Sequence, residues 1–272
     1  MATTSIDGIT IAYDDSGNGE NVLVLVHGHP FDRSMWHPQA KAFAASGWRV
    51  IVPDLRGYGE SSVIAGKTTF DVFVRDIAAL LDQLNIRDAV IGGLSMGGQI
   101  VMEFCRLYPE RVRGIVLAAT FPQAETEEGK LNRTIMADRL LNEGMMPYAE
   151  EVLSKMLAPR NLEALPAVAQ HVRSMMQGAH PAGAAAALRG RAERPDYEST
   201  LGGVDVPALI VVGAEDSFTT RADAERMHSL LKHSELVWME GVGHMPNLEN
   251  ELEFNAAVRR LLSAVRQGSP KG

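Results

Sequence analysis

The chain has 272 residues, a length that supports one globular unit with a sizeable core and no need of disulfides or metals. It carries 26 Lys and Arg against 34 Asp and Glu, and this net charge of −8 argues against partners such as nucleic acid or an anionic membrane surface. Cys105 is the only cysteine, so no internal disulfide can form, and no zinc-binding pattern exists. We therefore expect no metal site.

The N-terminal segment 1–8 is polar and lacks the apolar core of a signal peptide. No apolar run approaches the ~20 residues that a membrane-spanning helix needs. These features predict a cytoplasmic protein.

Predicted strands and helices alternate along the chain. Residues 5–13 predict a hairpin that turns at Asp7-Gly8, because this dipeptide favours a type I′ turn. Further strands are predicted over 22–26, 49–53, 89–93, 114–118, 206–212 and 236–239. Core helices are predicted over 34–45, 70–84, 100–107, 221–231 and 249–265, with a frayed end over 267–272. This repetition predicts an α/β fold with a doubly wound, mostly parallel sheet.

The pattern changes at about Pro122, and no convincing strand follows until about Thr200. We therefore divide the chain into a core of residues 1–121 and 201–272 and an inserted all-helical cap of residues 122–200. Cap helices are predicted over 131–142, 147–157, 161–177 and 181–193, with Gly144 and Gly178 as C-terminal caps. Six methionines gather here: Met136, Met145, Met146, Met156, Met175 and Met176. They are equally compatible with ordinary helix packing and with a lid that lines an apolar pocket.

Gly93-Leu94-Ser95-Met96-Gly97 forms a G-x-S-x-G pattern between an apolar strand and an amphipathic helix. A turn this tight forces Ser95 into a strained conformation and leaves no room for side chains two residues before and after it. The hydroxyl of Ser95 would then stand above the strand ends. The N–H of Met96 would lie at a helix N-terminus, where it can bind a developing oxyanion.

A carboxylate and an imidazole follow later strands. Asp216 comes just past a buried strand, and His244 lies in a loop beyond the last one. In open α/β sheets, ligand chemistry gathers outside the carboxyl ends of the strands, where Ser95 also lies. Serine becomes a nucleophile when a neutral imidazole takes its proton, and a carboxylate orients that imidazole. Glu215 is the alternative acid, because it neighbours Asp216.

The chain resembles α/β-hydrolase-fold serine hydrolases over nearly its whole length. The matching motifs, in chain order, are His27-Gly28-His29-Pro30, Asp54-Leu55-Arg56-Gly57-Tyr58-Gly59-Glu60-Ser61, Gly93-Leu94-Ser95-Met96-Gly97 and Gly243-His244. The resemblance implies the triad Ser95, Asp216 and His244, and it implies that His29 supplies the second oxyanion N–H. It favours Asp216 over Glu215. Relatives that use an aspartate nucleophile, such as haloalkane dehalogenases and epoxide hydrolases, are disfavoured by Ser95.

These motifs predict a cofactor-free enzyme that cleaves a small-molecule carboxylic ester or lactone through an acyl-enzyme on Ser95. The alternatives are C–C bond hydrolysis, perhydrolysis, or a hydrolase-fold receptor that turns over slowly. Neither the substrate nor the oligomeric state follows from the sequence. His27 is expected to make a structural hydrogen bond, and His171 and His180 are weaker candidates for substrate contact. Gly66-Lys67-Thr68 resembles the end of a phosphate-binding loop, but no strand precedes it, so we do not expect nucleotide binding.

Overall fold

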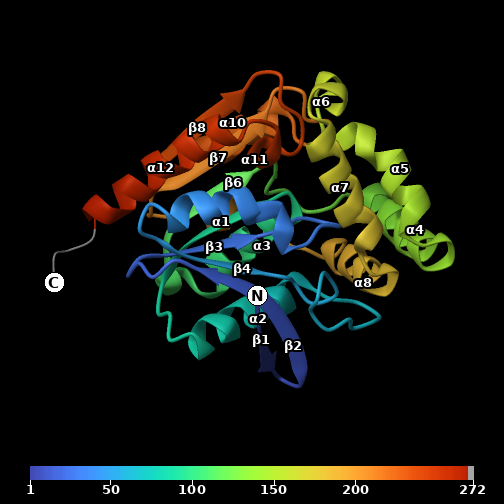
Figure 1. Ribbon diagram of the computed structural model, residues 1–272, viewed down its shortest axis with the longest axis horizontal. Coiled ribbons are helices and arrows are strands. Elements are labelled where there is room, and N and C mark those ends of the chain that lie inside the picture. Colours follow the sequence, from blue (N-terminus) through green and yellow to red (C-terminus); the bar gives the residue numbers. More distant parts are fainter. Residues whose placement is uncertain (269–272) are drawn as a thin grey trace.

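The computed structural model describes residues 1–268 and shows an eight-stranded sheet with helices on both faces (Figure 1). The strands lie in the order β1-β2-β4-β3-β5-β6-β7-β8. Their bounds are β1 Ala2–Ile6, β2 Ile9–Ser16, β3 Val22–Val26, β4 Arg49–Pro53, β5 Ala89–Leu94, β6 Val112–Ala118, β7 Ala208–Gly213 and β8 Ser234–Met239. Strands β3 to β8 are parallel to one another. β1 pairs antiparallel with β2, and β2 pairs antiparallel with β4. The predicted mostly parallel sheet is confirmed.

The N-terminal hairpin turns where the sequence predicts. Ile6 pairs with Ile9, so Asp7 and Gly8 form a two-residue loop. Their φ angles of 47° and 82° are both positive, as a type I′ turn requires.

The core helices cover both faces of the sheet. Their bounds are α1 His37–Ala44, α2 Phe70–Gln83, α3 Met96–Leu107, α10 Arg221–Leu230, α11 Pro246–Glu249 and α12 Glu251–Gly268, with 3-10 turns η1 Arg33–Trp36 and η2 Pro109–Arg111. Helices α1 and α12 contact each other on one face, and α2 and α3 contact each other on the other (Figure 1). Since both faces are covered, the central strands are apolar, and every residue of β3 and β5 is buried.

Helices α4 to α8 gather beside the carboxyl ends of the parallel strands (Figure 1). Their bounds are α4 Glu127–Glu143, α5 Met145–Met156, α6 Pro159–Ala164, α7 Pro166–Gly178 and α8 Pro181–Arg191, and the short α9 Glu198–Gly202 follows. Two glycines allow α8 to lie close against the core. A Cβ on Gly183 would lie 1.9 Å from the carbonyl oxygen of Gly57, and one on Gly190 would lie 1.6 Å from that of Thr68. Only glycine permits so close an approach.

Several predicted boundaries are wrong. The helix predicted over 161–177 is divided into α6 and α7 at Leu165, because the following Pro166 disfavours helical geometry in the residue before it. Helix α4 begins at Glu127 rather than at 131, capped by the hydroxyl of Thr126. Gly144 caps α4 as predicted, but Gly178 is the last residue of α7 and Ala179 is its cap. Helix α12 continues through 267–268, where fraying was predicted, and residues 269–272 of that prediction lie outside the described part of the chain.

The order of the strands places a crevice above the middle of the sheet. The neighbours of β3 are β4 on one side and β5 on the other, so the loops that leave β3 and β5 diverge toward opposite faces. Such a switch point is where open α/β sheets bind their ligands. The loop at 27–32 follows β3, and Ser95 follows β5.

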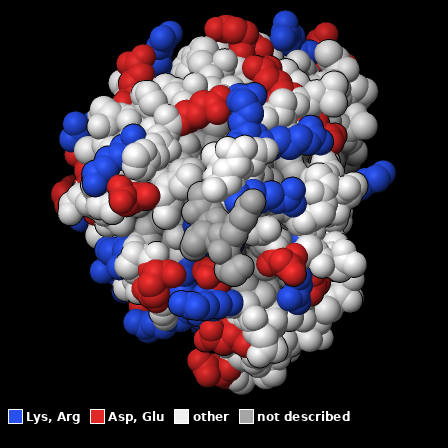
Figure 2. Space-filling view, turned by 90° about the vertical axis from the view of Figure 1, so that its left-hand side faces the viewer, with Lys and Arg blue, Asp and Glu red and all other residues white. Residues whose placement is uncertain are grey.

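On the face shown in Figure 2, acidic and basic side chains are interspersed rather than segregated into one large basic area. Among residues 1–268, no helix is long and apolar enough to cross a membrane.

Candidate active site

Ser95 occupies the sharp turn between β5 and α3. Its φ of 57° and ψ of −116° lie in a region that side-chain-bearing residues rarely adopt. A Cβ on Gly93 would lie 2.3 Å from the carbonyl carbon of Gly97, and a Cβ on Gly97 would lie 2.2 Å from the carbonyl oxygen of Val26. The predicted need for glycine on both sides of Ser95 is therefore confirmed, and the turn is held between β3 and α3.

The loop after β3 lies directly against this turn. A Cβ on Gly28 would lie 2.8 Å from the carbonyl oxygen of Leu94 and 3.3 Å from the Cβ of Ser95. His29, the next residue, therefore lies near the serine. Its backbone N–H donates no hydrogen bond within residues 1–268. Met96 is the first residue of α3, so its N–H has no acceptor inside the helix. Two main-chain donors thus flank Ser95.

His27 holds this loop in place. Its Nδ1 donates to the carbonyl oxygen of Gly28 at 2.8 Å, and its Nε2 accepts from the N–H of Leu55 at 3.0 Å. This pattern fixes the neutral imidazole with its proton on Nδ1. The expected structural hydrogen bond of His27 is confirmed.

Asp216 and His244 form a buried pair. Nδ1 of His244 lies 2.9 Å from both carboxylate oxygens of Asp216, and the N–H of Phe218 donates to the same carboxylate at 2.8 Å. Burial by itself raises the pKa of Asp216, but the charge and hydrogen bond of His244, with the N–H groups of Phe218 and Thr219, outweigh it and hold the pKa below its ordinary value. Glu215 is exposed and forms no side-chain hydrogen bond within residues 1–268. The geometry favours Asp216.

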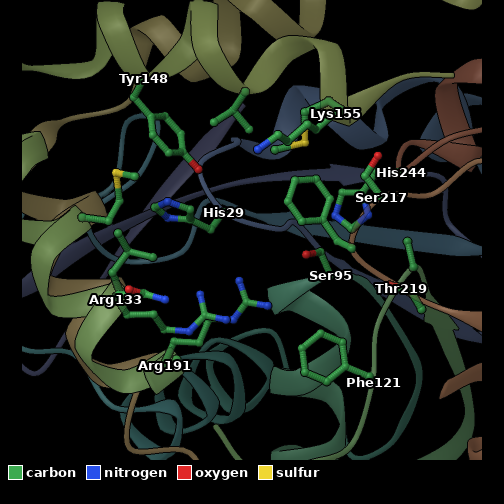
Figure 3. A pocket seen from close by; sticks show the side chains of 18 of the residues that line it. His29, Ser95, Phe121, Arg133, Tyr148, Lys155, Arg191, Ser217, Thr219 and His244 are labelled. Atoms are coloured by element: carbon green, nitrogen blue, oxygen red, sulfur yellow. The ribbon is translucent and has the colours of Figure 1, made fainter. Parts of the chain in front are cut away.

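Ser95 and His244 line the same cavity, which has a volume of about 610 Å³ (Figure 3). Within the described residues, the hydroxyl of Ser95 forms no hydrogen bond with His244. In unliganded enzymes such contacts are often long, and they tighten once substrate binds. A serine on a strained turn and an imidazole therefore share one cavity, and the imidazole is bound to a buried carboxylate.

A family model described as "alpha/beta hydrolase fold" matches residues 21–251, most of the chain. The chain belongs to the α/β-hydrolase family. Within that family it is similar to a thermophilic esterase from Thermogutta terrifontis, solved with malate bound, at 37% identity and a TM-score of 0.92 over 97% of each chain.

Two curated proteins illustrate the range of similar sequences. The 3-oxoadipate enol-lactonase 2 of Acinetobacter baylyi is 27% identical over 96% of both chains. The 2-hydroxy-6-oxononadienedioate/2-hydroxy-6-oxononatrienedioate hydrolase of Burkholderia vietnamiensis is 28% identical over 93% of this chain and 91% of its own. The family membership and these similarities establish that this α/β-hydrolase is a hydrolase.

Helices α4, α5 and α8 supply much of the cavity wall in this hydrolase. Met136 of α4 and Met156 of α5 line the cavity together with Tyr148 and Val152. The other cap methionines do not: Met145, Met175 and Met176 are buried among helices, and Met146 is 58% exposed. Two of the six methionines therefore line the cavity, and three others pack between helices.

Glu249 is a residue that the sequence analysis missed. This buried carboxylate accepts hydrogen bonds from the N–H groups of Gly243 and Met245, at 2.9 and 3.1 Å, on either side of His244. Its other oxygen accepts from the N–H of Ala158 and the amide of Asn161, both at 2.8 Å. Glu249 thus ties the His244 loop to the segment between α5 and α6. In the sequence, Glu249 is only a carboxylate five residues after His244, so its contacts with residues of a distant segment could not be predicted.

Other candidates have structural roles. Burial raises the pKa of the Cys105 thiol to about 12, so it stays protonated and unreactive. The side chain of His180 caps α8 by accepting from the N–H of Ala182, and His171 lies against Ser34 rather than in the cavity. Lys67 pairs with Glu193 at the surface. Within residues 1–268, no cluster of His, Cys, Asp and Glu has the arrangement of a metal site.

Proposed function

We propose that this hydrolase cleaves a carboxylic ester or lactone through an acyl-enzyme on Ser95. The observation that carries the proposal is the Asp216–His244 pair, buried in the same cavity as a serine on a strained turn. The similar enol-lactonase and esterase support this class of reaction.

In the proposed acylation, the hydroxyl oxygen of Ser95 bonds to the substrate carbonyl carbon while Nε2 of His244 takes the hydroxyl proton. The carbonyl oxygen becomes an oxyanion, which the N–H groups of His29 and Met96 stabilise. The carbon–oxygen bond to the alcohol then breaks, and His244 returns the proton to the leaving oxygen. Asp216 keeps the proton of the neutral imidazole on Nδ1 and stabilises the imidazolium that forms.

In the proposed deacylation, a water molecule takes the place of the alcohol. His244 accepts one proton from this water as its oxygen bonds to the acyl carbon. The bond to Ser95 then breaks, and the proton passes to the serine oxygen. The reaction uses only these side chains, two main-chain donors and water.

We assign residues 122–200 to a cap that covers the site. Helices α4, α5 and α8 supply cavity-lining residues, so the cap shapes the space around the substrate. Cap side chains therefore select among substrates, whereas the core residues carry out the bond cleavage.

The test of the nucleophile is the Ser95→Ala variant. It should lower kcat by about 10⁴- to 10⁶-fold with an unchanged circular dichroism spectrum, because the members of a triad act as a unit. Labelling with a fluorophosphonate should give one adduct, on the peptide that contains Ser95. Ser217 lines the same cavity, so peptide mapping provides an internal control. An adduct on Ser217, or wild-type activity in Ser95→Ala, would contradict the assignment.

Carbon–carbon bond hydrolysis is the second candidate, favoured by the similarity to the Burkholderia vietnamiensis hydrolase. A panel of esters, lactones and vinylogous diketones separates the two reactions by kcat/KM. A turnover number far below ~1–10³ s⁻¹ on the whole panel would instead support a ligand-binding role.

A further inference from the structure

One end of the cavity is unusually cationic. Arg191, at the end of α8, and Arg133, on α4, both reach into the space beside Ser95 (Figure 3). The guanidinium of Arg191 makes one hydrogen bond, from Nε to the side-chain oxygen of Gln99 at 2.9 Å. Within residues 1–268 no carboxylate forms an ion pair with Arg191. Its remaining N–H groups are available to a ligand.

The charges around this end of the cavity do not balance. Arg133 and Arg194 both bind one carboxylate, that of Glu125. Arg133, Arg191 and Arg194 therefore have one paired carboxylate among them, because the other carboxylate that lines the cavity, that of Glu151, pairs with Arg139. Burial lowers the pKa of Arg191, and the charges of Arg133 and Arg194 lower it further. Arginine nonetheless remains protonated in proteins. A site with this surplus of positive charge is electrostatically suited to an anion.

His29 lines the same cavity and has an unpaired ring nitrogen. Its side chain is only 6% exposed, and Nε2 is buried with no hydrogen-bond partner in the described residues. The other ring nitrogen lies 2.7 Å from the hydroxyl of Tyr58. Burial raises the pKa of Tyr58, so its hydroxyl keeps its proton and can donate it to Nδ1. The neutral imidazole then carries its own proton on Nε2, which is a donor without a partner among the described residues.

We propose that Arg191, assisted by Arg133 and by Nε2 of His29, binds a carboxylate of the substrate. This inference rests on the proposed function and specifies the substrate class: half-esters of dicarboxylic acids, or lactones that carry a carboxylate. A guanidinium matches a carboxylate with two parallel hydrogen bonds, and one such anion offsets much of the surplus charge.

The position of the arginines assigns the carboxylate to the acyl part of the substrate. His244 must lie beside the leaving alcohol, because it returns the proton to that oxygen. Arg133 and Arg191 lie on the other side of Ser95 from His244 (Figure 3). A carboxylate bound there is attached to the acyl carbon chain and not to the alcohol.

The test uses two substrates of equal chain length, p-nitrophenyl hexanoate and mono-p-nitrophenyl adipate. The wild type should prefer the adipate by at least tenfold in kcat/KM. Arg191→Met should lower kcat/KM for the adipate by about 10- to 100-fold, the usual loss when a charged hydrogen-bonding partner is removed. The loss should fall mainly on KM. The same variant should keep its activity on hexanoate, which also shows that it is folded.

Two control variants sharpen the result. Arg189→Met removes an arginine from the same helix, but that side chain pairs with Asp138 outside the cavity, so both substrates should be hydrolysed as by the wild type. Arg191→Lys should restore part of the preference for adipate. Equal losses on hexanoate and adipate in Arg191→Met would overturn the proposal.

A substrate with its charge on the alcohol tests the placement. The acetate ester of 4-hydroxybenzoate carries a carboxylate there, and it should gain nothing over phenyl acetate. A gain that Arg191→Met removes would contradict the acyl-side assignment.

Failure of the proposed function has a different signature, because then no ester is cleaved and Ser95 is not labelled. The anion site is still tested in that case through binding. Glutarate should raise the melting temperature of the wild type and of Ser95→Ala, but not of Arg191→Met. No shift in any of the three proteins would overturn the anion site independently of catalysis.

Discussion

Acid should destabilise this protein well before its carboxylates titrate. Burial lowers the pKa of both His27 and His29, that of His29 well below its ordinary value. His27 also uses Nε2 as an acceptor for the N–H of Leu55, a role that a protonated imidazole cannot fill. The folded state therefore holds both rings neutral, while the unfolded chain binds protons below about pH 6.5.

The sign and size of the effect follow from linkage. Since the unfolded state binds more protons below about pH 6.5, the stabilisation from the neutral rings is fully present above that pH and is lost as the pH falls. For each ring that stays neutral when folded, the free energy of unfolding falls with a slope that approaches about 1.4 kcal/mol per pH unit well below pH 6.5. From about pH 7.5 to 5.5, we expect a loss of about 1.4 kcal/mol from His29 alone and up to about 2.8 kcal/mol from both. Carboxylates contribute little there, because their unfolded pKa values lie near 3.9 to 4.3.

Urea unfolding at several pH values, in buffers free of carboxylates, measures this slope. His29→Gln should reduce the loss of stability between about pH 7.5 and 5.5 by about 1.4 kcal/mol, and above about pH 7.5 the curves of variant and wild type should run parallel. A stability that stays constant between about pH 7.5 and 5.5, or a slope unchanged by His29→Gln, would refute the reasoning.

Three further predictions concern the catalytic groups. Asp216→Asn should lower kcat by about 10³- to 10⁴-fold, because it no longer fixes the tautomer of His244, whereas Glu215→Gln should change kcat little. Steady-state kinetics of both variants test this, and a larger loss in Glu215→Gln would show that the carboxylate is wrongly assigned. Both oxygens of Glu249 accept from N–H groups, so the amide of Glu249→Gln opposes an N–H donor in either orientation. The variant should cost about 1–3 kcal/mol in urea unfolding and lower kcat more than it changes KM; unchanged kinetics would make Glu249 purely structural. His29→Ala keeps the oxyanion N–H and should retain kcat within about tenfold, but His29→Pro removes that donor and should cost about 10²- to 10³-fold; equal losses would contradict the main-chain role.

The parts of the site that were predicted from the sequence rest on local constraints. Gly93 and Gly97 are needed because a Cβ on either would collide with main-chain atoms of the turn or of β3. That requirement is confined to a few neighbouring residues, so the spacing of the glycines reveals it. Asp216 and His244 lie in the loops that follow β7 and β8, and the carboxyl ends of parallel strands lie at one edge of the sheet.

The helices of the proposed cap were less predictable, because their ends depend on single residues and on packing. Pro166 interrupts a segment whose composition otherwise reads as one helix. Met136 and Met145 have the same side chain in neighbouring cap helices, yet only Met136 reaches the cavity. Amphipathic spacing distinguishes a buried face from an exposed one, but it cannot separate a face against a neighbouring helix from a face against a ligand.

The net charge of the cavity was still harder to predict from the sequence, because it depends on which charged side chains are paired in the folded protein. Arg189 and Arg191 are alike in the sequence, two residues apart on one helix, but the first pairs with Asp138 and the second reaches Gln99, 92 residues away. Had Gln99 been a carboxylate, Arg191 would be neutralised and the cavity would lose its surplus charge. The substrate class proposed here therefore depends on which residue the first turn of α3 presents to the end of α8. That pairing exists only once Gly183 and Gly190 let α8 lie against the core.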